Sequence, residues 1–409
     1  MSQVHSNYKG EWFDSANLGI IYHWGVYSAA ARGEWIMNRE RYTPQEYYQT
    51  YGPRFTAENW DANQWMEDAL AAGARYVILT ARHHDGFCLW PSKTTSWHVG
   101  ELGPNRDLVG DFITAARMYG LRVGLYYSLA DWSHQSYPSG WERDWPLSWN
   151  QNNTDQQAFV EYCKAQLKEL MTNYGTIDYL WYDGAFPQPM DGSQINRMVY
   201  ELQPKILLNE RNGHPSDVRI SEQHLGPKPS RWEAAITLNR NWGYHGSDES
   251  WKSLGDLVRS FLTVRSEGGN FLVNLGPRAD GSIPNGSVSL LKDFGQWLSL
   301  CSSWFVSKSQ RNLFSWNNSV FLMPGVGGVL LFILEPLAED LRIWEFQNPI
   351  ESILCPRDNR KVEFYQHSDG WFRLINPPTP ENDVPVFLKI QLEGEVRVLT
   401  PRGQHWIIP

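Results

Sequence analysis

Cysteine is scarce in this chain, and the few cysteines lie far apart. Only four occur in 409 residues, and their spacing matches neither a disulfide framework nor a zinc site: Cys88, Cys163, Cys301 and Cys355. The 11 histidines include no His-x-x-x-His pair of the kind that binds zinc on a helix. We therefore expect neither disulfide bonds nor structural zinc.

Runs of basic residues and long apolar segments are also missing. The formal net charge is −9 at pH 7, and the isoelectric point is about 5.7. Nucleic acid and anionic membrane surfaces are therefore poor partners. No apolar stretch is long enough to span a bilayer, and residues 1–8 lack the charged-then-apolar pattern of a secretory signal. We expect a cytoplasmic protein.

Aromatic residues, in contrast, are abundant. The chain contains 21 Trp, 19 Tyr and 17 Phe, and many of the tryptophans stand next to Gly, His or acidic residues. One explanation is a large core that is rich in Trp. The other is a carbohydrate site, where flat rings supply apolar area beside polar groups. Composition alone leaves both open.

The length predicts one large domain and a smaller one. A chain of 409 residues accommodates a catalytic domain of roughly 250–300 residues and a second unit. Up to about residue 300, short apolar runs alternate with helical patterns, as in βα units around parallel strands: 18–23, 76–81, 121–128, 177–182, 206–211 and 270–275. From about Leu313, short strands alternate with Pro, Gly and Asn turns. We predict an irregular (β/α) TIM-like barrel over residues 1–312 and a small antiparallel β-sandwich over residues 313–409.

Asp183 stands at the end of a strongly predicted strand. Residues 177–182 are rich in β-branched and aromatic side chains, and Gly184 ends the run. Catalytic groups of parallel barrels collect at the carboxyl ends of the strands. A carboxylate between Trp181 and Tyr182 suits chemistry on a sugar, where positive charge develops. For an isolated Asp-Gly pair, the alternative is a capping or turn residue.

Other polar residues follow the ends of neighbouring predicted strands. They can converge on one mouth if the strands are parallel: His23, Glu34, His83, His84, Tyr126, Glu210 and Arg211. A zinc site is one alternative for the three histidines. Adjacent His83 and His84 would point to opposite sides of an extended chain, which argues against it. We predict no metal and no cofactor.

Several longer motifs resemble the retaining α-L-fucosidase family, in family order over roughly residues 10–300. They are His23-Trp24-Gly25, Glu34-Trp35, His83-His84-Asp85-Gly86-Phe87, Gly124-Leu125-Tyr126-Tyr127-Ser128, Trp181-Tyr182-Asp183-Gly184, Trp232-Glu233, Trp242-Gly243-Tyr244 and the 268–277 segment GGNFLVNLGP. The resemblance implies an irregular (β/α) barrel, a C-terminal β-sandwich, and release of L-fucose with retained anomeric configuration from fucosylated oligosaccharides or glycosides.

The resemblance also implies roles for single residues. Asp183 matches the nucleophile that forms a covalent fucosyl-enzyme. Residues that match the fucose pocket are His23, Glu34, Trp35, His83, His84, Tyr126, Trp181 and Arg211. For the acid/base, Glu222 is favoured over Glu233, because it follows Glu210-Arg211 and precedes the Trp-Glu pair. Glu233 is then a pocket-wall contact or part of the scaffold.

Two other functions compete with the fucosidase interpretation. One is a retaining glycosidase for α-galactosides on the same frame, because galactose and fucose share much of their hydroxyl pattern. The other is a fucose-binding lectin, which would be expected to lose the nucleophile or the acid. Linkage preference and oligomeric state, including a homo-oligomer, stay open. Loops around the leaving group would include residues 132–149.

Overall fold

The chain folds into two compact units in the computed structural model, which describes residues 9–137, 156–184, 192–226, 230–305, 319–344 and 346–397. The first unit comprises residues 1–252 and 269–292, and the second comprises residues 253–268 and 293–409. A single cut at residue 313 does not reproduce this division, because residues 253–268 and a stretch that begins at residue 293 group with the C-terminal strands.

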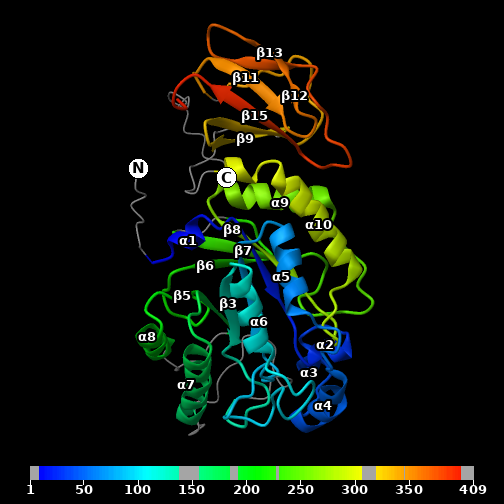
Figure 1. The fold of residues 1–409 in the computed structure, drawn as a ribbon, viewed down its shortest axis with the longest axis vertical. Helices are drawn as coiled ribbons and strands as arrows, with labels where there is room; N and C mark the ends of the chain where they lie inside the picture. The colour runs from blue at the N-terminus through cyan, green and yellow to red at the C-terminus, as the bar shows by residue number, and fades with distance from the viewer. Residues whose placement is uncertain are drawn as a thin grey trace. The chain divides into compact units, whose positions relative to one another are not determined.

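The first unit is built on an eight-stranded parallel sheet that curls into a barrel (Figure 1). Neighbouring strands follow the order β5-β4-β3-β2-β1-β8-β7-β6. Their bounds are β1 (Leu18–Tyr22), β2 (Tyr76–Arg82), β3 (Arg122–Ser128), β4 (Tyr179–Asp183), β5 (Leu207–Leu208), β6 (Arg219–Glu222), β7 (Trp232–Thr237) and β8 (Asn270–Leu275). A parallel bridge between Asn209 and Val218 links the two edge strands. The predicted TIM-like barrel is confirmed.

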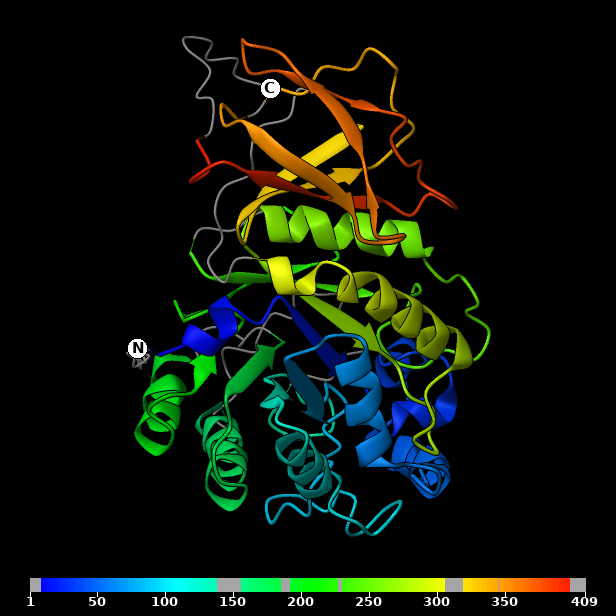
Figure 2. The same cartoon turned by 45° about the horizontal axis from the view of Figure 1, so that its top comes forward.

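Helices connect most of the strands and lie around the outside of the sheet (Figures 1 and 2). In the first unit they are α1 (Glu11–Asp14), α2 (Tyr27–Ala30), α3 (Ile36–Arg39), α4 (Pro44–Tyr51), α5 (Ala62–Ala71), α6 (Leu108–Met118), α7 (Gln156–Asn173) and α8 (Gly192–Leu202). The alternation breaks between β5 and β6, where residues 209–218 form a loop. This missing helix makes the barrel irregular.

The fifth strand is shorter than the sequence predicts. An extended run is expected over residues 206–211, but β5 contains only Leu207 and Leu208. The next residue, Asn209, pairs with β4 through its side chain: its amide donates to the Tyr182 carbonyl at 3.0 Å and accepts from the Tyr182 N–H at 3.0 Å. The backbone is therefore free to turn early, and Glu210 and Arg211 lie in the following loop.

Aromatic side chains fill the lower interior of the barrel. One buried cluster includes Phe13, Tyr76, Tyr126, Tyr179 and Trp181. Phe13 comes from α1 and contacts Tyr179 edge to face, with ring centroids 5.7 Å apart. On β1, Gly19 leaves room for the Tyr76 ring, because a Cβ atom there would lie 2.2 Å from Tyr76 Cζ. A glycine is therefore required at this point of the first strand.

The second unit combines two helices with two antiparallel sheets. The helices are α9 (Leu254–Ser266) and the end of α10 (Asn285–Ser299). The larger sheet has the order β12-β11-β15-β10-β9, and the smaller pairs β13 with β14. Their bounds are β9 (Val320–Gly325), β10 (Gly328–Ile333), β11 (Ile350–Cys355), β12 (Arg360–Lys361), β13 (Glu363–Gln366), β14 (Phe372–Ile375) and β15 (Val386–Leu392).

Alternation along β10 explains why the helices belong to this unit. Leu331 and Ile333 enter a core that also contains Phe372 and Leu374 of β14. Phe332 points the other way and contacts Trp297 of α10, with ring centroids 6.2 Å apart. The five-stranded sheet is thus covered on both faces, as expected for a sandwich layer.

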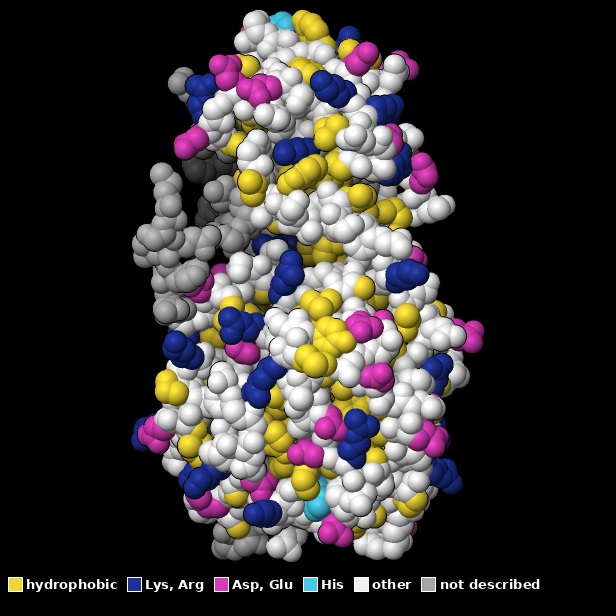
Figure 3. All heavy atoms as spheres, in the orientation of Figure 1, with side chains coloured by type: hydrophobic (Ala, Val, Ile, Leu, Met, Phe, Trp, Pro, Cys, Tyr) yellow, Lys and Arg dark blue, Asp and Glu magenta, His cyan; other side chains and the backbone are white. Residues whose placement is uncertain are grey.

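The surface carries charges of both signs. On the face drawn in Figure 3, basic and acidic side chains are interspersed over both units. Among the described helices, none is sufficiently long and apolar to cross a membrane. The surface charge and the described helices indicate no particular partner, so the function must depend on a local site.

We predict that Gly19→Ala destabilises the protein by about 1–3 kcal/mol, because the added methyl group collides with the Tyr76 ring in a packed interior. Thermal unfolding followed by circular dichroism measures the effect. Gly52→Ala is the matched control, because a Cβ atom at Gly52 meets its nearest neighbour at an ordinary 3.5 Å. A melting temperature for Gly19→Ala equal to that of Gly52→Ala would contradict the packing argument.

Candidate active site

The predicted site residues meet at one end of the barrel. His23 follows β1, His83 and His84 follow β2, Asp183 ends β4 and Glu222 ends β6. Because all strands are parallel, these positions share the carboxyl edge of the sheet. The structure therefore brings together residues that are almost 200 positions apart in the sequence.

Asp183 is held by three neighbouring side chains. Tyr126 donates its hydroxyl to Oδ2 at 2.6 Å, and Arg211 donates Nη2–H to Oδ1 at 2.7 Å. His84 Nε2 lies 3.6 Å from Oδ2. Burial alone would raise the pKa of Asp183, but the Arg211 charge, His84 and the Tyr126 hydrogen bond outweigh it and lower the pKa to about 2. Asp183 is therefore a carboxylate at neutral pH.

Arg211 joins Asp183 to a second carboxyl group. Its Nη1 atom lies 2.7 Å from Glu222 Oε2, while Nη2 binds Asp183. Burial, together with the negative charge of Asp183, raises the pKa of Glu222 above its ordinary value, although Arg211 opposes the shift. The Glu222 side chain is 32% exposed and that of Asp183 is 13% exposed. Asp183 is thus ionised and mostly enclosed, whereas Glu222 holds a proton more readily and is more exposed to solvent.

The three histidines of the site are uncharged at neutral pH. Burial lowers the pKa of His23 and of His84 to about 4, and lowers that of His83 well below its ordinary value. His23 Nδ1 lies 2.6 Å from Asn274 Oδ1, and His84 Nδ1 lies 2.7 Å from Ser128 Oγ. Neutral imidazoles with one nitrogen engaged can use the other for hydroxyl groups.

The expectation that His83 and His84 point to opposite sides is wrong. Their ring centroids lie 4.2 Å apart, because β2 ends at Arg82 and the histidines no longer follow extended strand geometry. Nitrogen atoms of both rings and an oxygen of Asp183 lie within 4.8 Å of one another, a grouping that could hold a metal ion. Tyr126 and Arg211 each already donate a hydrogen bond to one Asp183 oxygen, so a cation would compete with both donors and would lie close to the positive charge of Arg211.

Glu34 and Trp35 form another wall. The Glu34 side chain is buried and accepts a hydrogen bond from the Gly243 N–H at 2.8 Å. Burial raises its pKa. The Trp35 ring contacts His84 at a centroid distance of 5.3 Å and Trp132 at 4.9 Å. Trp35 thus lies beside His84, and Glu34 is close enough to Asp183 for the two charges to interact.

Glu233 does not line the pocket. Its exposure is 0%, and it lies on β7 inside the barrel. Its carboxylate accepts hydrogen bonds from Tyr76 at 2.5 Å, Tyr179 at 2.8 Å and Trp181 Nε1 at 2.9 Å. Burial raises its pKa to about 7. The pocket-wall interpretation of Glu233 is therefore not supported by the geometry, whereas the scaffold interpretation agrees with it.

The structure adds Trp242, Asn274 and Ser128 to the site residues, and it places Trp132, from the loop expected around the leaving group, against Trp35. Trp132 packs on Trp35, Trp242 lies 5.2 Å from the His23 ring, and Asn274 and Ser128 orient two histidines. Trp242 belongs to the Trp242-Gly243-Tyr244 motif, which is the sequence feature from which its place in the site could have been predicted. In the 132–149 loop proposed to surround the leaving group, residues 138–149 lie outside the described residues.

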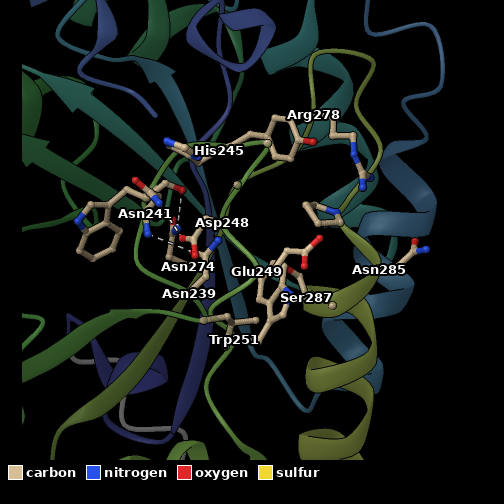
Figure 4. A pocket seen from close by; sticks show the side chains of 18 residues that line it. Asn239, Asn241, His245, Asp248, Glu249, Trp251, Asn274, Arg278, Asn285 and Ser287 are labelled. Carbon is tan, nitrogen blue, oxygen red and sulfur yellow. Dashed lines mark hydrogen bonds between the residues drawn. The ribbon is translucent and has the colours of Figure 1, made fainter. Parts of the chain in front are cut away.

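A second hollow, of about 340 Å³, is lined in part by Gly243 (Figure 4). Its lining residues come from β8 and from the chain after β7 and after β8, and include Asn241, Asp248, Glu249, Trp251 and Arg278. Asn241 and Asp248 hydrogen bond to each other at 2.7 Å. Neither of the two carboxyl groups joined by Arg211 lines this hollow, but Trp242, Gly243 and Asn274 do, so it adjoins the site described above.

Comparison with known proteins points to one family. The model of the family "Alpha-L-fucosidase" matches residues 1–302. The tissue α-L-fucosidase of Bos taurus is 31% identical over 344 residues, which cover 76% of this chain and 71% of that protein. The α-L-fucosidase of Dictyostelium discoideum is 28% identical, with 81% of this chain and 79% of that protein covered.

Solved structures agree with the sequence matches. α-L-Fucosidase isoenzyme 1 from Paenibacillus thiaminolyticus superimposes with a TM-score of 0.83 at 29% identity, over 94% of this chain and 99% of that chain. Thermotoga maritima α-fucosidase, solved with a mechanism-based inhibitor, gives a TM-score of 0.74 at 27% identity, over 93% and 96% of the two chains. This chain therefore belongs to the α-L-fucosidase family of glycoside hydrolases.

Proposed function

We propose that this α-L-fucosidase releases terminal L-fucose from fucosylated oligosaccharides or glycosides with retention of anomeric configuration. Asp183 is the nucleophile and Glu222 is the acid/base. The observation that carries the proposal is the pair of carboxyl groups joined by Arg211, with the pKa of one lowered and that of the other raised. A retaining glycosidase needs one ionised and one protonated carboxyl group, about 5–5.5 Å apart.

In the first step, the Asp183 carboxylate attacks the anomeric carbon of fucose. Glu222 gives its proton to the glycosidic oxygen, the bond to the leaving group breaks, and a covalent fucosyl-enzyme forms. Arg211 and Tyr126 hold Asp183 in one orientation before the attack. A positioned nucleophile lowers the entropy loss of reaching the transition state.

In the second step, water resolves the intermediate. Glu222 is now a carboxylate and takes a proton from a water molecule as the water attacks the anomeric carbon. The bond to Asp183 breaks, its carboxylate is restored, and fucose leaves with its original configuration. The greater exposure of Glu222 suits this step, because the water has to reach it from solvent.

The pocket lining fits a deoxy sugar with several hydroxyl groups. Neutral histidines donate and accept hydrogen bonds, and the buried Glu34 accepts them. Trp35 and Trp181 supply aromatic surface on which C–H bonds and the C5 methyl group can pack. A galactoside would place a polar hydroxymethyl group where fucose has this methyl group.

We predict that Asp183→Asn lowers kcat for nitrophenyl α-L-fucoside by about 10³-fold or more, because the amide cannot attack the anomeric carbon. Asp178→Asn is the control at the opposite end of the same strand, where Asp178 pairs with Arg122. In Asp183→Gly, added azide should restore turnover and give the inverted fucosyl azide. Activity of Asp183→Asn close to that of the wild type would refute the nucleophile assignment, and faster hydrolysis of nitrophenyl galactoside by the wild type would favour the galactosidase alternative.

We predict that Glu222→Ala lowers kcat by about 10²–10⁴-fold for oligosaccharides, whose leaving groups need a proton, and less for nitrophenyl fucoside. In the wild type, the alkaline limb of kcat/KM reports loss of the Glu222 proton, and its raised pKa moves that limb to higher pH. The limb should flatten in Glu222→Ala. Glu249→Ala, at an exposed acid in the second hollow, is the control. The assignment fails if Glu222→Ala cleaves both substrate types like the wild type.

We predict that chelators leave the activity unchanged, because Arg211 already supplies the positive charge beside Asp183 and both Asp183 oxygens are hydrogen bonded. The measurement compares hydrolysis of nitrophenyl fucoside before and after dialysis against EDTA. A loss of activity that added zinc restores would show that His83, His84 and Asp183 bind a catalytic metal ion.

A further inference from the structure

The Glu233 carboxylate is buried without a charged partner. Among the described residues, no Lys, Arg or His side chain forms an ion pair with it, and its three hydrogen-bond donors are neutral. An ionised carboxylate in a protein interior is unfavourable unless its oxygens are fully hydrogen bonded. Burying an acid at this position costs free energy that an apolar residue would not. The hydrogen bonds that Glu233 makes therefore call for an explanation.

The donors connect Glu233 to the strand that carries Asp183. Tyr179, Trp181 and Asp183 alternate along β4, so their side chains point to the same face of the sheet. Glu233 Oε1 accepts from both Tyr179 and Trp181, and Oε2 accepts from Tyr76 across the barrel. The hydrogen bond to Nε1 restrains the plane of the Trp181 indole.

The Trp181 indole in turn contacts both hydrogen-bond donors of Asp183. The Tyr126 ring stacks on it, with centroids 5.4 Å apart and an interplanar angle of 16°. The Arg211 guanidinium carbon lies 5.6 Å from the indole centroid. Tyr126 binds Asp183 Oδ2 and Arg211 binds Oδ1. A tilt of the indole would therefore shift both groups that orient Asp183.

We infer that Glu233 is a positioning residue for the fucosidase reaction, which acts by fixing the Trp181 indole against Tyr126 and Arg211. The inference rests on the proposed role of Asp183 as nucleophile. It assigns Glu233 neither substrate contact nor proton transfer, because the side chain has no exposed surface. The part of Glu233 that matters is an acceptor oxygen for the Trp181 N–H.

The central experiment is a double-mutant cycle between Glu233 and Trp181. Glu233→Met removes the acceptor and fills the space, and we expect kcat for nitrophenyl fucoside to fall about 10- to 100-fold through loss of alignment. Trp181→Phe removes the indole N–H. In the Trp181→Phe background, Glu233→Met should lower kcat far less, because no N–H remains to be fixed. Equal losses in both backgrounds would overturn the inference.

Two further variants separate positioning from general stability. Glu233→Gln keeps an acceptor oxygen for Tyr179 and Trp181, and Tyr76→Phe removes the donor to the other oxygen, Oε2, so each should keep kcat within about threefold of the wild type. A loss in either variant as large as that in Glu233→Met would overturn the inference. Melting temperatures of all variants show whether activity and stability change together.

The acid limb of kcat/KM supplies a readout that packing alone would not change. In Glu233→Met, misplaced Tyr126 and Arg211 should stabilise ionised Asp183 less, so the limb should move to higher pH. If Glu233→Met does not fold, Glu233→Asp replaces it, because the shorter side chain keeps the charge but withdraws the oxygen from Trp181. An unchanged kcat and an unchanged acid limb in Glu233→Asp would overturn the inference.

The wild type and Asp183→Asn are measured beside these variants. A wild type that does not hydrolyse nitrophenyl fucoside, or an active Asp183→Asn, refutes the proposed function itself. Normal hydrolysis by the wild type, together with normal kcat and acid limb in the Glu233 variants, refutes only the positioning role.

Discussion

The chemistry of the site depends on one guanidinium group placed between two carboxyl groups. Arg211 binds Asp183 through one nitrogen and Glu222 through another, at 2.7 Å in each case. Because Asp183 is also bound by Tyr126, it takes the negative charge, and its charge disfavours ionisation of Glu222. Arg211 favours ionisation of both acids, but His84 and Tyr126 add to its effect at Asp183, whereas burial and the Asp183 charge outweigh it at Glu222. The two acids therefore differ in protonation, which is what nucleophilic attack and proton donation require.

The position of Arg211 depends in turn on an irregularity of the barrel. If the fifth strand had its full predicted length, it would continue to pair with β4. Arg211 would then be held within the hydrogen-bonded sheet. Instead, the Asn209 amide takes over the last hydrogen bonds to Tyr182. The backbone leaves the sheet after two residues and brings Arg211 back over the end of β4. The loss of regular pairing at this edge is therefore part of how the site is built.

The sequence predicts the strand ends better than the directions of the side chains there. Parallel strands with polar ends place His23, His83 and Asp183 at one mouth by topology alone, whereas the sequence indicated Glu222 only through its resemblance to the family. The proximity of His83 and His84 could not be read in this way, because it depends on where β2 stops being extended. The level at which Glu233 lies inside the barrel could not be predicted either, because residues near the mouth and residues near the floor of a barrel follow the same alternating pattern. Only the register of β7, in which Glu233 pairs with Ile220 two residues below Glu222, reveals its level.

The abundance of tryptophan has a double explanation. Several indoles are buried in packing roles away from the site, among them Trp24, Trp65 and Trp90, so a Trp-rich core accounts for part of the composition. Others surround the carboxyl groups, where Trp35 packs against Trp132 and Trp181 supports Tyr126. Trp181 serves both purposes, because its N–H binds the interior Glu233 while its ring contacts the groups that hold Asp183.

An indole suits this place better than a phenyl ring, since it can carry a hydrogen bond at its edge and keep both faces free for packing. The aromatic content that indicates a sugar site thus also forms the rigid support on which that site rests.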